Sequence, residues 1–161
     1  LIMASSYLAI SSLFYHREIS ESNRGERLTD DEIALTKDIF GNEVNTNIIK
    51  KHFKAEDSNI LAYVMFEDNR NIYFLGKENS SRNYAVDNRM EVYKTFIHEM
   101  THIWQNQEQS FTRNIKSYCS TYEYELDSKT AFDNLCAEQQ ASVIEDYAVM
   151  FLSPWRNYPD L

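Results

Sequence analysis

Hydrophobic and polar positions alternate with two different periods along the chain, which divides it into helical and extended parts. From 27 to 42, RLTDDEIALTKDIFGN has the spacing of one helix. Thr29 and Glu32 form a capping box at its start, and Gly41 can take the left-handed position at its end. From 47 to 87, short β-rich runs are separated by Asp, Asn, Ser and Gly: NIIKKHF, AYVMF, NIYFLG and NYAVD. Within them, YVMFEDNRNIYFL has the pattern of a hairpin.

Helical spacing returns from 87 to 107, with Asn88 and Glu91 as a second capping box, and again from roughly 130 to 152, before Pro154. This order predicts a single α+β domain over 1–161 with a small antiparallel sheet. We interpret residues 1–26 as an N-terminal helix and loop that link the domain to a longer protein. The apolar run LIMASSYLAISSLFYH is too short and polar to span a bilayer.

Composition narrows the classes of partner. Hydrophobic residues make up 43% of the 161 positions, enough for a packed core, and the formal net charge is −9. That charge repels phosphate backbones and anionic lipid surfaces, so we expect neither nucleic-acid binding nor membrane insertion. The two cysteines, Cys119 and Cys136, are compatible with a disulfide or with two thiols, and their spacing does not decide between them.

The segment TFIHEMTHIWQNQ contains two of the four histidines, His98 and His102, in an HExxH pattern. Positions four apart lie on one face of a helix, so both imidazoles can reach one ion. At 100° per residue, the apolar residues fall on the opposite side of this helix: Val92, Tyr93, Phe96, Ile97, Met100, Ile103 and Trp104. A histidine pair belonging to the core would lie among those residues, so the pattern favours metal binding.

A catalytic zinc ion needs three protein ligands and an open position. The last predicted helix places Glu138 and Glu145 on one polar stripe, and either carboxylate can complete the set. Its apolar residues are expected on the opposite face: Phe132, Cys136, Val143, Ile144, Tyr147, Met150 and Phe151. Because the two glutamates are seven residues apart on one face, spacing does not choose between them.

The neighbouring residues have the chemistry of peptide hydrolysis. Glu99 lies at the edge of the histidine stripe, where its carboxylate can take a proton from a zinc-activated water and pass it to the leaving amine. The developing oxyanion requires a further hydrogen-bond donor. Tyr122 and Tyr124, in STYEYEL between the two helices, are the candidates.

FIHEMTHIWQ followed by EQQASVIEDY resembles the zincin-like metallopeptidase domains fused to type VI secretion VgrG spike proteins and Rhs-type toxins. LTDDEIALTKDIFGNEVN resembles the opening segment of the same group, and NIYF resembles its strand. The resemblance extends from about Arg27 onward. It implies a zincin fold with one catalytic zinc ion held by His98, His102 and Glu138, and Glu99 as the catalytic residue.

The resemblance also implies a biological role, that of a secreted antibacterial effector acting in the periplasm of a target bacterium. Its expected partners are a protein or peptide substrate, a secretion spike component and a cognate immunity protein. In related glutamate zincins an Asp that orients a histidine often stands where this chain has Ser142, and Asp146 is the predicted substitute.

Two alternatives use the same residues differently. One is a catalytically inactive, zinc-stabilised protein-binding module, and the other is an adaptor or immunity-like protein without metal. The fourth coordination position separates the first from an enzyme. A buried protein ligand there, such as Glu145, would make the site structural, whereas an open position favours catalysis.

Overall fold

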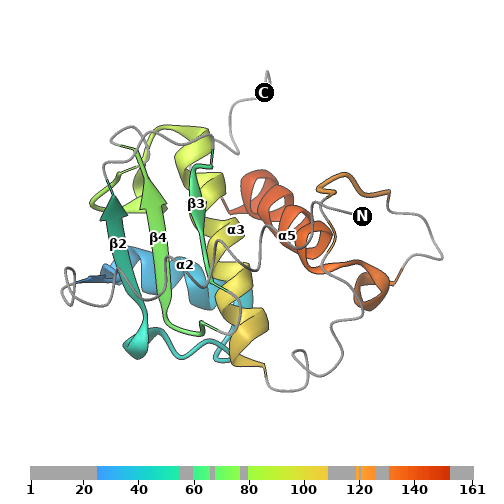
Figure 1. Ribbon diagram of the computed structural model, residues 1–161, viewed down its shortest axis with the longest axis horizontal. Coiled ribbons are helices and arrows are strands. Elements are labelled where there is room, and N and C mark those ends of the chain that lie inside the picture. The colour runs from blue at the N-terminus through green and yellow to red at the C-terminus, as the bar shows by residue number, and fades with distance from the viewer. Residues whose placement is uncertain are drawn as a thin grey trace, which may run out of the picture.

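The computed structural model describes residues 25–54, 60–65, 68–76, 80–108, 119, 121–125 and 131–152. The helix predicted within residues 1–24 lies outside this part. The elements are β1 (Glu26–Arg27), α2 (Asp30–Phe40), η1 (Thr46–Ile48), β2 (Lys50–Lys54), β3 (Ala62–Tyr63), β4 (Asn71–Leu75), η3 (Tyr84–Val86), α3 (Met90–Gln107), η4 (Phe132–Asn134) and α5 (Ala137–Phe151). The predicted α+β class is confirmed (Figure 1).

Four short strands form one sheet in the order β1-β2-β4-β3. The predicted hairpin is confirmed, because Ala62 lies opposite Phe74 in the antiparallel pair of β3 and β4. β1 is antiparallel to β2, but β2 runs parallel to β4, so the sheet is mixed and the prediction of an antiparallel sheet is wrong for its central pair. The reason is topological: the chain goes from β2 to the far edge and returns as β4 between β2 and β3. A hairpin pattern does not specify how an earlier strand joins it.

α2 begins as the sequence predicts and is joined to the sheet by a buried ion pair. Thr29 and Glu32 form both hydrogen bonds of the capping box, and Gly41 ends the helix with a φ of 61°. Glu32 also accepts from the Lys51 ammonium at 2.8 Å, with both side chains fully buried, and from the backbone N–H of Tyr84 at 2.8 Å. One carboxylate thus connects α2, β2 and η3.

The core lies between the sheet and the apolar side of α3. Phe74 of β4, Tyr84 of η3 and Phe96 of α3 stack in succession, with ring centroids 4.2 and 5.3 Å apart. The α3 residues predicted to face the core are buried, with Trp104 partly buried: Val92, Tyr93, Phe96, Ile97, Met100 and Ile103. The facing predicted for α3 is therefore confirmed, and the opposite side of the helix is left for the histidines.

Two local predictions are wrong. The run NYAVD is a 3-10 turn and not a strand, since Tyr84 inserts into the core and its N–H is held by Glu32. Asn88 does not cap α3, which begins at Met90 after Arg89. Arg89 instead binds Asp87, with a guanidinium–carboxylate distance of 2.7 Å. The predicted final helix is present, but it begins at Ala137 after the short η4 turn.

α3 lies between the sheet and α5, in contact with both (Figure 1). The face that α5 buries is small: Ala137, Ala141 and Ala148 are buried together with Gln140. The predicted apolar face is wrong in its larger members, since Tyr147, Met150 and Phe151 are 49%, 61% and 57% exposed. Alanines let two helices approach closely, which brings the polar stripe of α5 beside that of α3. Within the described residues, no helix is long and apolar enough to cross a membrane.

Candidate metal site

Two imidazoles of α3 and one carboxylate of α5 converge on one point. Oε2 of Glu138 lies 3.1 Å from Nε2 of His98 and 3.4 Å from Nε2 of His102. One ligand atom from each of the three residues lies within 4.8 Å of the others. Ligands about 2.0–2.1 Å from a tetrahedral zinc ion are separated by about 3.4 Å. The two contact distances are therefore close to the spacing that zinc ligands would have.

The donor set and its surroundings fit zinc. Two imidazole nitrogens and one carboxylate oxygen are a ligand set of catalytic zinc. The three side chains are only 13%, 15% and 16% exposed, so they form a largely buried centre. Next to them Glu99 is buried, and its Oε2 has no hydrogen-bond partner among the described residues. A buried carboxylate oxygen without a partner is costly unless a ligand or water completes it.

The electrostatic surroundings of His98 and Glu138 favour a positive charge between them. Burial opposes charge on His98, but hydrogen bonds with Glu138 and Glu145 raise its pKa to about 10. Burial also opposes charge on Glu138, but hydrogen bonds from His102 and His98 lower its pKa to about 2. Without metal, a proton on His98 therefore compensates the Glu138 carboxylate. A divalent cation would displace that proton and take over the compensation.

Glu99 differs from the other carboxylates of the cluster. Burial dominates and raises the pKa of its carboxyl, with partial opposition from His102 and His98. The backbone of Val64, just after β3, forms a hydrogen bond with this carboxylate. Glu99 is thus a more basic carboxylate than an exposed one, and it is fixed between the metal ligands and the edge of the sheet.

The second nitrogen of each histidine also has a partner. Nδ1 of His98 lies 3.2 Å from Oε2 of Glu145, and Nδ1 of His102 lies 2.8 Å from Oε1 of Gln105. Lys94 contacts the other oxygen of Glu145 at 2.9 Å. The structure thus separates the two glutamates that spacing left equivalent. Glu138 faces both Nε2 atoms, whereas Glu145 lies on the far edge of one ring.

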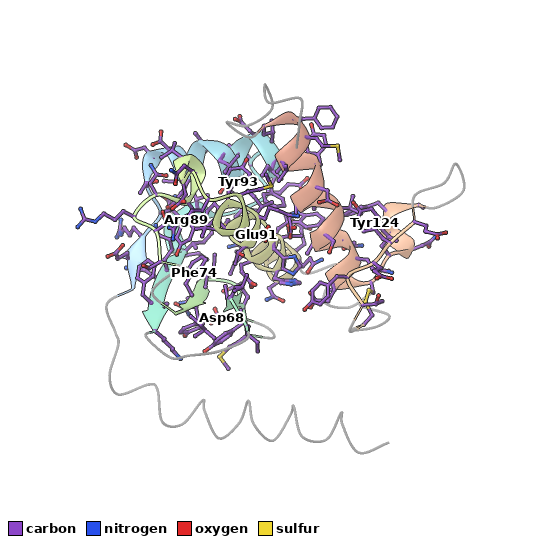
Figure 2. The ribbon with its side chains drawn as sticks, turned by 90° about the horizontal axis from the view of Figure 1, so that it is seen from above. Asp68, Phe74, Arg89, Glu91, Tyr93 and Tyr124 are labelled. Atoms are coloured by element: carbon purple, nitrogen blue, oxygen red, sulfur yellow. A yellow bond between two sulfur atoms is a disulfide. The ribbon has the colours of Figure 1, made fainter. Side chains whose placement is uncertain are left out.

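The two candidate tyrosines have different surroundings. The ring of Tyr122 is 5.8 Å from the ring of His98, and the residue is 59% exposed. The hydroxyl of Tyr124 donates to Asp146 at 2.6 Å, and Figure 2 shows Tyr124 beside α5, away from the core residue Tyr93. Tyr122 is therefore beside the candidate metal ligands, whereas the hydroxyl of Tyr124 is engaged elsewhere.

Cys119 and Cys136 form a disulfide, which decides the alternative that spacing left open. Cys136 caps α5 two residues before Glu138, and Cys119 lies close to Tyr122 in the chain. Gln139 donates to the backbone oxygen of Glu123 at 2.9 Å. The tyrosine segment is thus attached to the end of α5 that carries the third candidate ligand.

The structure brings together His98, His102, Glu138 and Glu99, with Tyr122 at the edge. It does not place Asp146 in the predicted histidine-orienting role, since Asp146 binds Tyr124 and lies 3.6 Å from Lys94. Glu145 is the carboxylate that contacts Nδ1 of His98. The sequence signal that could have found it is the seven-residue spacing from Glu138, which keeps both on one helical face.

Fold and site together define an α+β domain with a His–His–Glu candidate metal centre on two adjacent helices. The chain is 25% identical over 141 residues to the type VI secretion system spike protein VgrG2b of Pseudomonas aeruginosa. The matched region covers 79% of this chain and 13% of that protein. The solved effector domain of P. aeruginosa VgrG2b matches with a TM-score of 0.62 and 24% identity, covering 91% of this chain and 86% of that one. No protein-family model matches. The chain has the fold of that effector domain and spans a small part of the spike protein's length.

Proposed function

We propose that this chain is a zinc-dependent metallopeptidase domain with a zincin fold. The observation that carries the proposal is the convergence of His98 and His102 on one oxygen of Glu138, with the buried carboxylate of Glu99 beside them. Three ligands plus a neighbouring basic carboxylate are the minimal requirements of a metal-assisted hydrolase.

The chain's own residues have distinct roles in this proposal. His98, His102 and Glu138 hold the zinc ion. When bound, zinc polarises a peptide carbonyl and makes a nearby water more acidic. Glu99 accepts the proton of the attacking water and transfers it to the leaving amine, a role that suits its raised pKa. Tyr122, exposed beside His98, is the candidate donor to the oxyanion.

The position of Glu145 supports an enzyme over an inactive, zinc-stabilised binding module. Such a module requires a fourth protein ligand, and Glu145 is the candidate that the sequence offers. Its carboxylate is held between Nδ1 of His98 and the Lys94 ammonium, on the opposite edge of the ring from Nε2. Glu145 is therefore not placed as a fourth ligand, and among the described residues the cluster of possible ligands is His98, His102 and Glu138.

We further propose that the domain is an effector of a type VI secretion system. The support is its similarity to the spike protein VgrG2b and to the effector domain of that protein. In this role it is secreted with a spike component, cleaves a protein or peptide in the periplasm of a target bacterium, and is neutralised by an immunity protein. The disulfide supports an oxidising site of action.

The variant Glu99→Gln tests the reaction because it preserves the size of the side chain and removes the base. We expect it to bind zinc as the wild type does, and to lose about 10²–10⁴-fold in hydrolysis of an unfolded protein substrate. It should also lose toxicity when exported to the periplasm of a bacterial host. Metal analysis of untagged protein measures the first result, and a proteolysis assay measures the second.

His102→Ala is the matched control, since it removes a ligand from the same helix and should lose both zinc and activity. A Glu99→Gln protein as toxic as the wild type would refute the catalytic role. Zinc binding without hydrolysis by the wild type would favour the binding module. Absence of zinc from the wild type would remove the metal centre altogether.

A further inference from the structure

α5 presents two carboxylates to one imidazole, one to each ring nitrogen. Oε2 of Glu138 is 3.1 Å from Nε2 of His98, and Oε2 of Glu145 is 3.2 Å from Nδ1. If His98 binds the metal through Nε2, which faces His102 and Glu138, then Nδ1 carries a proton and donates it to Glu145. A metal-binding histidine commonly has such an outer carboxylate, which fixes its tautomer and the orientation of its ring.

Lys94 holds Glu145 in this place. Its ammonium lies 2.9 Å from Oε1 of Glu145, while Oε2 faces His98. Lys94 and His98 are four residues apart on α3, so both meet the same carboxylate from one face of that helix. The Glu145 side chain is 17% exposed. With both oxygens engaged from α3, the carboxylate is restrained from turning to the metal side of the ring.

The other histidine has an analogous arrangement with an amide. The Nε2 amide group of Gln105 donates to the backbone oxygen of Ala137 and to Oε1 of Gln140, each at 3.1 Å. Because its N–H groups are engaged there, Oε1 of Gln105 faces Nδ1 of His102 as an acceptor at 2.8 Å. Gln105 is 2% exposed. Both imidazoles thus have an acceptor at Nδ1, which leaves the Nε2 lone pairs directed at the common point.

We propose that Glu145, anchored by Lys94, is a positioning residue that holds the His98 imidazole as its Nδ1–H tautomer with Nε2 directed to the metal. This inference rests on the proposed function and deepens it. The sequence suggests Asp146 as the residue that orients a histidine, and this inference assigns that role to Glu145 instead. Asp146 lies outside this contact, because its carboxylate binds Tyr124.

The test measures zinc affinity and the imidazole proton, not turnover. Glu145→Ala removes the acceptor, and we expect zinc affinity to fall about 10–100-fold in competition with a chromogenic chelator. Glu145→Gln still accepts a hydrogen bond and should fall between the wild type and Glu145→Ala. In ¹⁵N-histidine-labelled, zinc-loaded wild type, the His98 Nδ1–H should give a proton signal protected from exchange. That signal should be lost in Glu145→Ala.

Lys94→Met should weaken zinc binding less than Glu145→Ala, because it frees the carboxylate without removing it. Ser142→Ala is the control on the same face of α5. Within the described part of the chain, the Ser142 hydroxyl donates to the Glu138 backbone oxygen at 3.1 Å and contacts neither histidine, so zinc affinity should be unchanged. If Glu145→Ala fails to fold, Glu145→Gln and Lys94→Met should each still bind zinc more weakly than the wild type and Ser142→Ala, and wild-type affinity in both would overturn the positioning role.

Two outcomes overturn different statements. Wild-type affinity and a retained Nδ1–H signal in Glu145→Ala would overturn the positioning role while the zinc peptidase proposal stands. A wild type that does not bind zinc, with His102→Ala indistinguishable from it, would overturn the proposed function itself.

Discussion

The two tyrosines of STYEYEL lie two positions apart in the chain, yet their hydroxyl groups have different surroundings. The Tyr122 ring is tilted against the His98 ring and is mostly exposed, so Tyr122 lies beside the candidate metal ligands. Tyr124 donates its proton to Asp146, and burial together with this bond raises its pKa to about 12. A hydroxyl so engaged contributes to stability and not to an oxyanion.

This difference predicts opposite effects of removing one oxygen atom. Tyr122→Phe should lower kcat about 10²-fold, as expected for the loss of one oxyanion donor. Tyr124→Phe should keep kcat within a few-fold and lose about 1 kcal/mol of unfolding free energy with its hydrogen bond to Asp146. Steady-state kinetics and urea unfolding of both variants measure this. Equal kinetic losses in the two variants would contradict the assignment.

At the scale of elements, local sequence signals predict what depends on one segment alone. The cap of α2, the burial of one side of α3 and the β3–β4 pair follow from spacing and from capping chemistry. The parallel pairing of β2 with β4 does not, because it depends on where the chain returns to the sheet. The exposure of Met150 and Phe151 is also not local, since alanines form the buried face of α5.

In the candidate site too, some features follow from one helix alone and others depend on contacts between helices. His98 and His102 share a face by helical geometry alone, so the sequence predicts their proximity. The choice between Glu138 and Glu145 depends on how far α5 is shifted along α3, which no single-helix pattern contains. The structure places Glu138 against both Nε2 atoms and Glu145 against one Nδ1. The long-range contact therefore distinguishes a candidate ligand from a residue that positions one.

The buried ion pair between α2 and the sheet predicts how the stability of the protein depends on Lys51. Lys51→Met would leave the fully buried Glu32 carboxylate without its cation, so we expect a loss of about 3–5 kcal/mol. The control is Lys50→Met in the same strand. The Lys50 ammonium donates to the Gly25 backbone oxygen at 3.4 Å, and its loss should cost within about 0.5 kcal/mol. Chemical unfolding measures both values. A Lys51→Met protein as stable as the Lys50→Met protein would refute the role of the pair.

Across the whole molecule, the candidate metal centre is one of the polar contacts that connect α3 to α5. α3 belongs to the core with the sheet, and α5 lies against it through a narrow alanine face. The His–Glu contacts connect these two helices beside that face. A bound zinc ion would replace a proton-mediated link by coordination, so stability, metal and pH should depend on one another.

The pKa shifts fix the sign of that dependence. Glu138, with its pKa lowered to about 2, stabilises the metal-free fold above about pH 4.5, and this contribution is lost as the pH falls toward 2. His98, with its pKa raised to about 10, stabilises it below about pH 6.5, and this contribution is lost as the pH rises toward 10. Between about pH 4.5 and 6.5 the metal-free protein retains both stabilising contributions, that of Glu138 and that of His98.

In the presence of zinc, the stability of the protein should depend on pH in the opposite direction at the upper end of this pH range. In the metal-free fold His98 keeps its proton up to about pH 10, and zinc binding displaces this proton, so zinc affinity should increase with pH until about pH 10. With free zinc at a hundred times its Kd, the gain in unfolding free energy should be about 2.7 kcal/mol. At fixed free zinc, the gain should therefore be larger near pH 8 than near pH 6. Thermal unfolding in chelator and in buffered zinc at both values measures this, with His102→Ala as the variant that should gain nothing. A zinc gain that shrinks as the pH rises would show that the metal binds elsewhere than on these imidazoles.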